Sequence, residues 1–349
     1  MNLNIFKRLE EKEMNRSKQY LARFLVIVFV IGLLAGYGGT SQAADQTISM
    51  KLATSASAMG ISGRTFTFFA QALKEESQGT LLLEVFPASS LISDPDMLDA
   101  LMRGNVDVGH LPIAHLSVVM NELIPLEVPG ALPGGKFLEF ADALRPNIDR
   151  VMNKYGIKYV GRIAADDMVF VGNIQVKTAS DLAGAKVRTA GKWAGEAVVG
   201  WGGSAVAITI SELSSALERK IVDLAHTNWV PVMSFSLYDV SKYVSVTNMA
   251  ATFSCVVMSD ITWQKLSPNQ KEAFTRACKR LEKFNIENTE REYEVFIKTA
   301  TENNCEVYVM TPEENETFMS EVDKLLEVIR PSVGSEGAEL IELLKSMSE

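Results

Sequence analysis

The residue that most clearly asks for a chemical explanation is Arg188, which ends the short apolar segment "AKVR". It is followed by a stretch rich in glycine that also contains Trp193 and Trp201. In open α/β folds, ligands bind beyond the carboxyl ends of the strands, and a guanidinium there presents a planar set of donors that fits a carboxylate. The position therefore predicts a carboxylate ligand for Arg188. The alternative is a surface salt bridge, which contributes only about 0–1 kcal/mol and could sit anywhere.

Other chemistry has little support in the chain. There is no HExxH, GxSxG, Walker or GxGxxG motif, and no nucleophile stands out, although composition alone does not exclude a Ser-His-Asp arrangement. The three histidines, His110, His115 and His226, could bind a metal only if the fold brought them together, and a structural role is the more common one for such residues. We therefore expect no cofactor, no metal and no catalysis.

The elements that must position Arg188 follow an alternating order. Strand-like segments at residues 47–55 and 80–86 flank a helical pattern at 63–79, and a further helix and short strand follow at 94–112. Such βαβα order predicts a parallel sheet covered by helices. A second series of strands includes the one that ends at Arg188, and the last ~85 residues show the periodicity of helices with one polar face.

One internal similarity bears on domain organisation. The segment "ALMRGNVDVGH" at residues 100–110 matches "ALERKIVDLAH" at 216–226 in alanine, leucine, arginine, valine, aspartate and histidine. It predicts two lobes of related design, each with a helix, a short buried strand and a loop bearing a histidine, and two such lobes would enclose a cleft. Chance similarity of two amphipathic units is the alternative.

Composition limits the partners and the number of domains. A chain of 349 residues with 47% hydrophobic residues suits one large domain or two of medium size. The net charge of −9 argues against nucleic acid and anionic membranes as partners. It leaves room for a small anion held by local donors. Cys255, Cys278 and Cys305 form no CxxC pair, and we expect all three to be small buried side chains.

The N-terminus predicts export. The apolar run at residues 24–35 is shorter than the ~20 residues of a membrane span, and Ser41 and Ala43 suit a signal-peptidase site. The expected signal peptide covers residues 1–43 and leaves a soluble periplasmic protein, with an uncleaved anchor as the alternative. Met14 is an alternative start.

Five segments together resemble the DctP-type solute-binding receptors of tripartite ATP-independent periplasmic (TRAP) transporters. Each is weak alone, but their order and spacing are fairly specific. The segments are "LEVFPASSL" (83–91), "DMLDALMRGNVDVG" (96–109), "DLAGAKVR" (181–188), "SELSSALERKIVD" (211–223) and "LSPNQKEAF" (266–274).

This resemblance implies an α/β, two-lobed periplasmic binding protein, type II-like, with hinge strands and a long helix that spans both lobes. It implies capture of a ligand in the cleft, delivery to integral-membrane permease subunits, and no catalysis. In the family, the arginine that ends the "GxKxR" segment grips the ligand carboxylate, and here that position is Arg188.

The chain also departs from the family. Met168, preceded by Asp166 and Asp167, stands where many relatives have a second ligand arginine; Thr227 replaces the usual asparagine, and Asn228 follows one residue late. The lost cation argues against a dicarboxylate or a sugar acid. The aspartates either face solvent or cap a turn, or one of them receives a ligand ammonium.

Met168 and the tryptophans Trp193, Trp201 and Trp229 suggest a ligand with an apolar or aromatic body, although at least one of the tryptophans should be core. The leading hypothesis is a receptor for a small monocarboxylate such as tryptophan or an indole- or phenyl-substituted acid. The alternatives are a periplasmic enzyme acting on a small carboxylate and the ligand-binding domain of a sensor.

The expected organisation and site can be stated by residue. After the signal peptide, residues 44–168 form mainly lobe 1, residues 169–255 mainly lobe 2, and residues 256–349 a helix-rich part that returns to both lobes. The candidate ligand-binding residues are Arg188, Ser55, Met168, Asp167, Trp193, Ile210, His226, Asn228 and Trp229.

Overall fold

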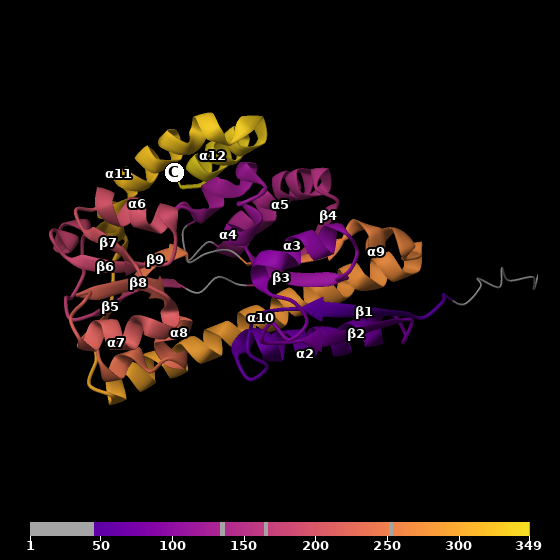
Figure 1. Ribbon diagram of the computed structural model, residues 1–349, viewed down its shortest axis with the longest axis horizontal. Coiled ribbons are helices and arrows are strands. Elements are labelled where there is room, and N and C mark those ends of the chain that lie inside the picture. Colours follow the sequence, from indigo (N-terminus) through magenta and orange to yellow (C-terminus); the bar gives the residue numbers. More distant parts are fainter. Residues whose placement is uncertain (1–44, 133–136, 164–166, 251–253, 349) are drawn as a thin grey trace, which may run out of the picture. The chain divides into compact units, whose positions relative to one another are not determined.

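Two β-sheets organise the chain in the computed structural model, which describes residues 45–132, 137–163, 167–250 and 254–348 (Figure 1). The first sheet has the order β2-β1-β3-β10-β4 and the second the order β11-β9-β5-β8-β6-β7. The strands are β1 (Ile48–Ala53), β2 (Leu81–Phe86), β3 (Val108–Pro112), β4 (Ile157–Ile163), β5 (Asp167–Gly172), β6 (Lys186–Thr189), β7 (Ser204–Ala207), β8 (Leu224–Asn228), β9 (Tyr243–Ala250), β10 (Ser254–Ser259) and β11 (Glu306–Val309).

The strands of the βαβα series pair in parallel as expected, but each sheet as a whole is mixed, because it also holds one antiparallel strand. β1 pairs in parallel with β2 and β3, but β10 runs antiparallel to β3 and β4. In the second sheet, β5 runs antiparallel to β8 and β9. The reason lies in the connections: β4 belongs to one sheet and β5 to the other, and the same is true of β9 and β10. The chain thus passes between the sheets twice on strands, which reverses the direction of one strand in each.

Helices and short helical turns connect the strands. Those before α10 are α2 (Ile61–Glu76), α3 (Asp94–Met102), α4 (Ile113–Leu116), η1 (Asn121–Glu127), α5 (Phe137–Lys154), η3 (Ala179–Leu182), α6 (Lys192–Gly200), η4 (Ile210–Glu212), α7 (Leu213–Glu218), α8 (Trp229–Ser234), η5 (Leu237–Asp239) and α9 (Asp260–Lys265). The C-terminal part holds α10 (Pro268–Glu302), α11 (Pro312–Ile329), η6 (Arg330–Ser332) and α12 (Gly334–Ser348).

Helix α10 is the element that serves both sheets. It begins at a capping box in which Ser267 and Gln270 satisfy each other's backbone N–H groups, with Pro268 in the first turn. Along its 35 residues it packs against α2 and β4 of the first sheet and against α8 and β11 of the second (Figure 1). This is the long helix spanning both lobes that the family resemblance implied.

The two similar segments occupy equivalent places in the two sheets. In the first, a carboxylate oxygen of Asp107 accepts a hydrogen bond from the backbone nitrogen of Lys51 at 2.8 Å. In the second, Asp223 accepts one from the backbone nitrogen of Lys186 at 2.8 Å. Each aspartate therefore ties the turn before a central strand to the neighbouring parallel strand. This shared bonding supports a common design over chance similarity.

The histidines of the two segments lie within strands, so the expected histidine-bearing loops are wrong. His110 is in β3 and His226 in β8. Each is buried beside a phenylalanine: the ring centroids of His110 and Phe66 are 5.0 Å apart, and those of His226 and Phe170 are 4.9 Å apart. In both cases the strand continues past the histidine because an antiparallel neighbour pairs with that part of it.

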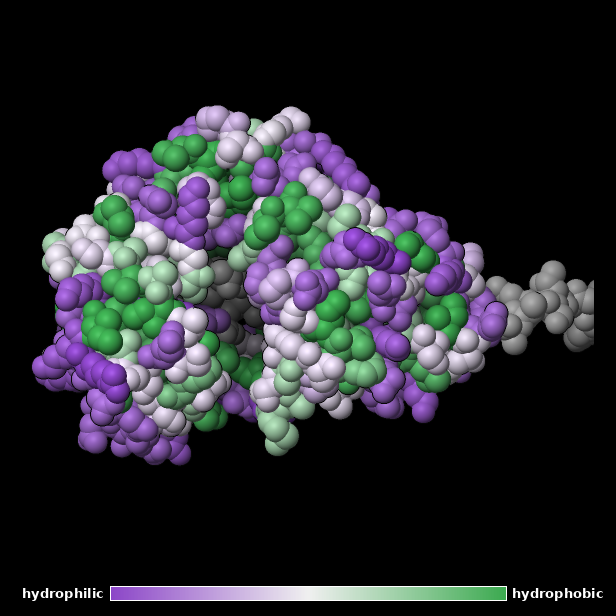
Figure 2. Space-filling view, in the orientation of Figure 1, coloured by the Kyte–Doolittle hydropathy of each residue, from purple (hydrophilic) through white to green (hydrophobic). Residues whose placement is uncertain are grey.

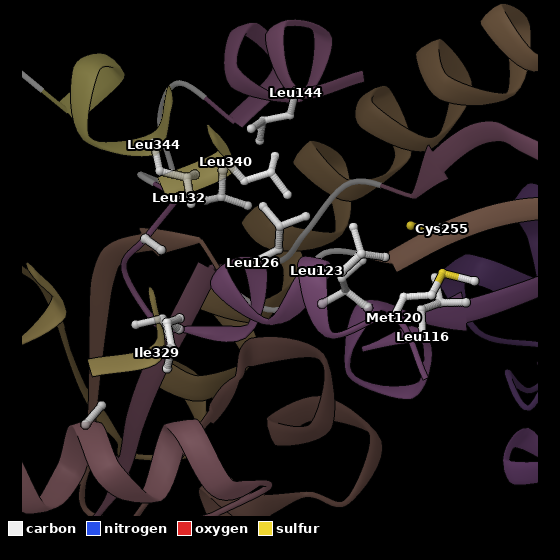
Figure 3. Packing of buried hydrophobic residues seen from close by; sticks show 14 of the residues in the cluster. Leu116, Met120, Leu123, Leu126, Leu132, Leu144, Cys255, Ile329, Leu340 and Leu344 are labelled. Carbon is white, nitrogen blue, oxygen red and sulfur yellow. The ribbon is translucent and has the colours of Figure 1, made fainter. Parts of the chain in front are cut away.

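A leucine-rich core anchors the segment that precedes residue 133. Leu123 and Leu126 of η1 are buried against α12, where Leu340 and Leu344 are also buried (Figure 3). Because each fully buried leucine contributes about 1.5–3 kcal/mol, this contact fixes the path of η1. It also fixes where the next residue, Glu127, can point.

Several further expectations concern the chain as a whole. Cys255, Cys278 and Cys305 are free and buried, as expected. The predicted signal peptide lies outside the described residues. Among the described residues, no helix combines the length and the apolar character needed to cross a membrane. On the face shown in Figure 2, hydrophobic residues lie in separate patches with hydrophilic residues between them.

Candidate functional site

A pocket of about 110 Å³ draws its walls from segments attached to both sheets. One wall is the end of η1 and the residues after it, at positions 126–129. The opposite wall comes from the second sheet, where β5, the start of α6 and the end of β8 meet. The pocket residues that we had expected from sequence are Met168, Trp193, His226 and Asn228.

These four side chains are brought together by the topology of the second sheet. β5 and β8 are antiparallel neighbours, and their register pairs Met168 with Asn228. Asn228 also occupies the N-cap position of α8. Trp193 lies in the first turn of α6, half-buried, with the Lys192 ammonium 4.5 Å from its ring centroid. The pocket thus combines an apolar surface with a few polar groups, which is typical of small-molecule sites.

His226 is the most buried polar residue of the pocket, with an exposed fraction of 1%. Neither ring nitrogen has a hydrogen-bond partner among the described residues. Burial lowers its pKa to about 3, and the positive charge of Arg188 contributes in the same direction. His226 is therefore a neutral imidazole with one donor and one acceptor to offer.

Arg188 lies on β6 next to this pocket and lines a different hollow. That hollow is more open and shares Ala190 and Gly191 with the pocket. The Arg188 side chain is 4% exposed, and its Nε donates to the carbonyl oxygen of Ile208 at 2.8 Å. Burial lowers the pKa of its guanidinium, and among the described residues no carboxylate forms an ion pair with it. Within this part of the chain, Arg188 is thus a buried cation without a matching anion.

The remaining tryptophans near the site belong to the core. Trp229 is 2% exposed and stacks on Phe296 with ring centroids 5.4 Å apart. Trp201 donates from Nε1 to the carbonyl oxygen of Phe318 at 3.1 Å. Neither lines the pocket, so the proposal that they cover the ligand gains no support from it, and their burial agrees with the expectation that at least one tryptophan is core. Their apolar surface is already taken up by helices α10 and α11.

Three other expected site residues lie away from the pocket. Ser55 follows β1 and is exposed, and Ile210 in η4 packs against the core of the second sheet. Asp167 at the start of β5 is half-buried without a hydrogen bond or ion pair among the described residues, and burial raises its pKa to about 6. It is thus not freely solvated, although it does not line the pocket. Asp166 is outside the described residues.

Glu127 is a pocket residue that sequence reasoning missed. The hydroxyl of Ser117 donates a hydrogen bond to its carboxylate, and burial raises its pKa. The available signal was a lone acid within the otherwise apolar "LIPLEVPGAL". Nothing in that run shows which sheet the acid will face, so the sequence alone assigns Glu127 no role.

The described residues suit binding better than metal chemistry. No group of three or more histidine, cysteine, aspartate or glutamate side chains within them is placed to hold a metal ion. His110 is tied to Thr54 by a 3.0 Å hydrogen bond, and His115 lies 3.8 Å from Asp94. The histidines are therefore spread over three separate environments.

Two sheets joined by strands that pass between them, a helix packed on both, and a pocket with walls from both sides define a two-lobed solute-binding protein. Residues 52–330 match the family described as "Bacterial extracellular solute-binding protein, family 7", or DctP. The chain therefore belongs to this family, the DctP type of TRAP transporter receptor. Its members are solute receptors and not enzymes.

Individual relatives share modest identity with this chain. A solute-binding protein of Albidiferax ferrireducens is 23% identical over 225 residues, which cover 63% of this chain and 66% of the relative. The 2,3-diketo-L-gulonate-binding periplasmic protein YiaO of Escherichia coli is 27% identical over 259 residues, covering 72% and 76%.

Solved structures of TRAP receptors share the fold. One from Ochrobactrum anthropi superposes with a TM-score of 0.80 at 22% identity, covering 87% of this chain and 96% of its own. DctP6 of Bordetella pertussis, a receptor binding pyroglutamic acid, gives 0.75 at 16% identity, covering 86% and 100%. A receptor from Desulfovibrio salexigens with bound orotic acid gives 0.74 at 19% identity, covering 85% and 97%.

Proposed function

We propose that this chain is a periplasmic receptor that captures a small organic monocarboxylate in the cleft and delivers it to the integral-membrane subunits of a TRAP permease. The observation that carries the proposal is the buried guanidinium of Arg188, which has no carboxylate partner among the described residues. Burying an unpaired charge is costly. A ligand carboxylate would remove that cost with two charge-assisted hydrogen bonds.

Arg188 is prepared for this role by its backbone contact. Because Nε donates to Ile208, the plane of the guanidinium is set before any ligand arrives. A donor fork that is fixed in advance loses less side-chain entropy when it binds. The shared walls at Ala190 and Gly191 place the hollow of Arg188 beside the pocket. A ligand can thus present its carboxylate to Arg188 in the hollow and its body to the pocket.

The size of the pocket favours a compact ligand body. An apolar cavity of about 150 Å³ holds benzene, and the pocket here measures about 110 Å³. Of the tryptophans, only Trp193 lines it. An indole ring is larger than benzene, so we favour an aliphatic or single-ring acid over tryptophan and indole acids. Pyroglutamic acid and orotic acid, which two structural relatives bind, are single-ring acids.

The segment at residues 1–43 would direct export, and cleavage there would release the mature receptor. Such a location fits a family described as extracellular. A sensor domain that uses the same fold is the competing function, and it differs in its partner. Co-purification with detergent-solubilised permease subunits, strengthened by ligand, supports the receptor; capture by a signalling protein alone contradicts it.

Isothermal titration calorimetry tests the ligand class. The probes are cyclopentanecarboxylate, benzoate, L-pyroglutamate, indole-3-propionate and succinate, with native mass spectrometry of any acid that co-purifies. We expect one of the compact monocarboxylates to bind, and Arg188→Ala to weaken that binding by about 2–5 kcal/mol. The control is Arg219→Ala, at an exposed position after α7. Near-native affinity of Arg188→Ala would overturn the proposal.

A further inference from the structure

One charged group in the pocket has no counterpart within it. The pocket residues among the described part of the chain include Glu127 but no lysine or arginine. No basic side chain there forms an ion pair with Glu127 either. Arg188 faces the neighbouring hollow instead. The pocket is therefore acidic at one point, although the ligand proposed for it is an acid.

The contact with Ser117 involves only one of the two carboxylate oxygens of Glu127. Ser117 is 3% exposed, and its hydroxyl, which has one hydrogen to donate, lies within hydrogen-bond distance of both Oε1 of Glu127 and the carbonyl oxygen of Ala114. Burial raises the pKa of Glu127, and the contact with Ser117 offsets only part of that rise. Oε2 forms no hydrogen bond within the described residues. Glu127 thus has one oxygen held by the protein and one free to accept a hydrogen bond.

Two features keep the protein's own groups from donating a hydrogen bond to Oε2 of Glu127. Glu127 ends η1, whose buried Leu123 and Leu126 hold it against α12, so the carboxylate stays at the pocket wall. On the opposite wall, His226 is neutral, because burial and Arg188 lower its pKa to about 3. His226 therefore provides no positive charge that would neutralise the Glu127 carboxylate.

We propose that Glu127 determines specificity by accepting a hydrogen bond from a nitrogen of the ligand, which is then a small monocarboxylate carrying an ammonium or amide N–H group. This inference rests on the proposed function, because it assumes that Arg188 takes the ligand carboxylate. A ligand with a negative group at one end and a nitrogen donor at the other matches both walls. A plain carboxylic acid in the pocket would take the place of water at Oε2 of Glu127 without supplying a donor, which is unfavourable.

Three probes of one shape test this. Cyclopentanecarboxylate, L-pyroglutamate and L-proline are each a five-membered ring with a carboxylate; the first has no N–H, the second an amide N–H and the third an ammonium. Calorimetry is run on wild type, Glu127→Gln and the control Glu316→Gln, which lies on the exposed face of α11. The amide that replaces the carboxylate in Glu127→Gln keeps an oxygen for the Ser117 hydroxyl, and thermal melting verifies that the variant is folded.

We expect wild type and Glu316→Gln to prefer proline or pyroglutamate over cyclopentanecarboxylate by about tenfold or more, as a charge-assisted hydrogen bond provides. Glu127→Gln should lose that preference and bind cyclopentanecarboxylate at least as well as wild type. Equal affinity of wild type for the three probes, absence of binding included, overturns the inference. So does an equal loss for all three in Glu127→Gln.

The two proposals fail in different ways. If wild type binds cyclopentanecarboxylate as tightly as proline, and Arg188→Ala abolishes both, then the receptor for a monocarboxylate stands and the role of Glu127 falls. If wild type binds none of the acids in either panel, both fall. If proline binds and Arg188→Ala has no effect, the carboxylate anchor is elsewhere, and both proposals fall as stated.

Discussion

The carboxylate of Asp223 accepts a hydrogen bond from the backbone nitrogen of Lys186, and this 2.8 Å contact ties the turn before β8 to the start of β6. β6 carries Arg188, and β8 carries His226 and Asn228. This hydrogen bond adds to the parallel pairing of β6 with β8 and so links the strand of the proposed carboxylate anchor to the strand of the pocket wall. Asp107 makes the same contact to Lys51 in the other sheet, whose strands do not line the pocket.

This pair yields a matched prediction. Asp223→Ala and Asp107→Ala should each lower the free energy of unfolding by about 1–3 kcal/mol, because each leaves a backbone N–H without its charged acceptor. Only Asp223→Ala should also weaken ligand binding, since it loosens β6. Urea denaturation and calorimetry on both variants measure the two effects. Equal losses of affinity in the two variants would contradict a local role for Asp223.

The buried histidines predict acid sensitivity. The pKa is about 4 for His110 and about 3 for His226 in the folded protein, in each case because burial disfavours the charged form. An unfolded histidine has a pKa of about 6.5. At pH values between the folded and unfolded pKa, the unfolded chain binds more protons than the folded one. The free energy of unfolding is therefore greatest above about pH 6.5 and decreases as the pH falls toward 4 or 3.

The size of this effect can be measured. Lowering the pH from 7 to 5 should reduce the free energy of unfolding by about 2 kcal/mol for each histidine, since the dependence is about 1.4 kcal/mol per pH unit. His110→Gln removes one titrating group distant from the pocket, and the slope of unfolding free energy against pH between about 5 and 6.5 should decrease by about one proton. Denaturant titrations at several pH values test this. An unchanged slope would mean that His110 is accessible to protons in the folded state.

Two tryptophans should respond in opposite ways to substitution. Trp193 lines the pocket and is half-buried, so Trp193→Ala should weaken ligand binding with little loss of stability. Trp229 is stacked in the core, so Trp229→Ala should cost about 3–5 kcal/mol of unfolding free energy. Trp229→Phe, a milder change, should keep ligand affinity. A strong loss of affinity in folded Trp229→Phe would return that residue to the ligand site.

The contact between η1 and α12 predicts long-range control of the pocket wall. Leu340→Ala removes a fully buried side chain beside Leu123 and Leu126 and should destabilise the protein by about 2–5 kcal/mol. Because η1 carries Glu127, the variant should also lose discrimination between L-proline and cyclopentanecarboxylate. Leu73→Ala, in the separate core around α2, is the control and should destabilise without changing discrimination.

Export provides a further prediction. Cleavage after residue 43 should give a periplasmic protein that begins at Ala44. N-terminal sequencing of the protein released by osmotic shock checks this. An intact N-terminus recovered with membranes would show that the apolar run at residues 24–35 is an anchor.

The sequence by itself determined the features that depend on local chemistry. The repeated "VD" segments predicted two related units because the same residue types recur at the same offsets; in the structure, each aspartate bonds to the neighbouring parallel strand. The periodicity of the last ~85 residues predicted their helices, and the start of α10 depends on local chemistry too, because its capping box is complete within four residues. The place of Arg188 near the end of a strand followed from the pattern of apolar residues around it.

Only the tertiary structure decided which side chains meet. Trp193, Trp201 and Trp229 look alike in sequence, yet helices α10 and α11 cover the last two and leave the first at the pocket. Strand β11 is four residues long and exists because β9 pairs with it. Glu127 reaches the pocket because leucines of η1 find their partners on α12, at the far end of the chain. Such contacts between distant segments are set by packing, which leaves no local pattern for a sequence to show.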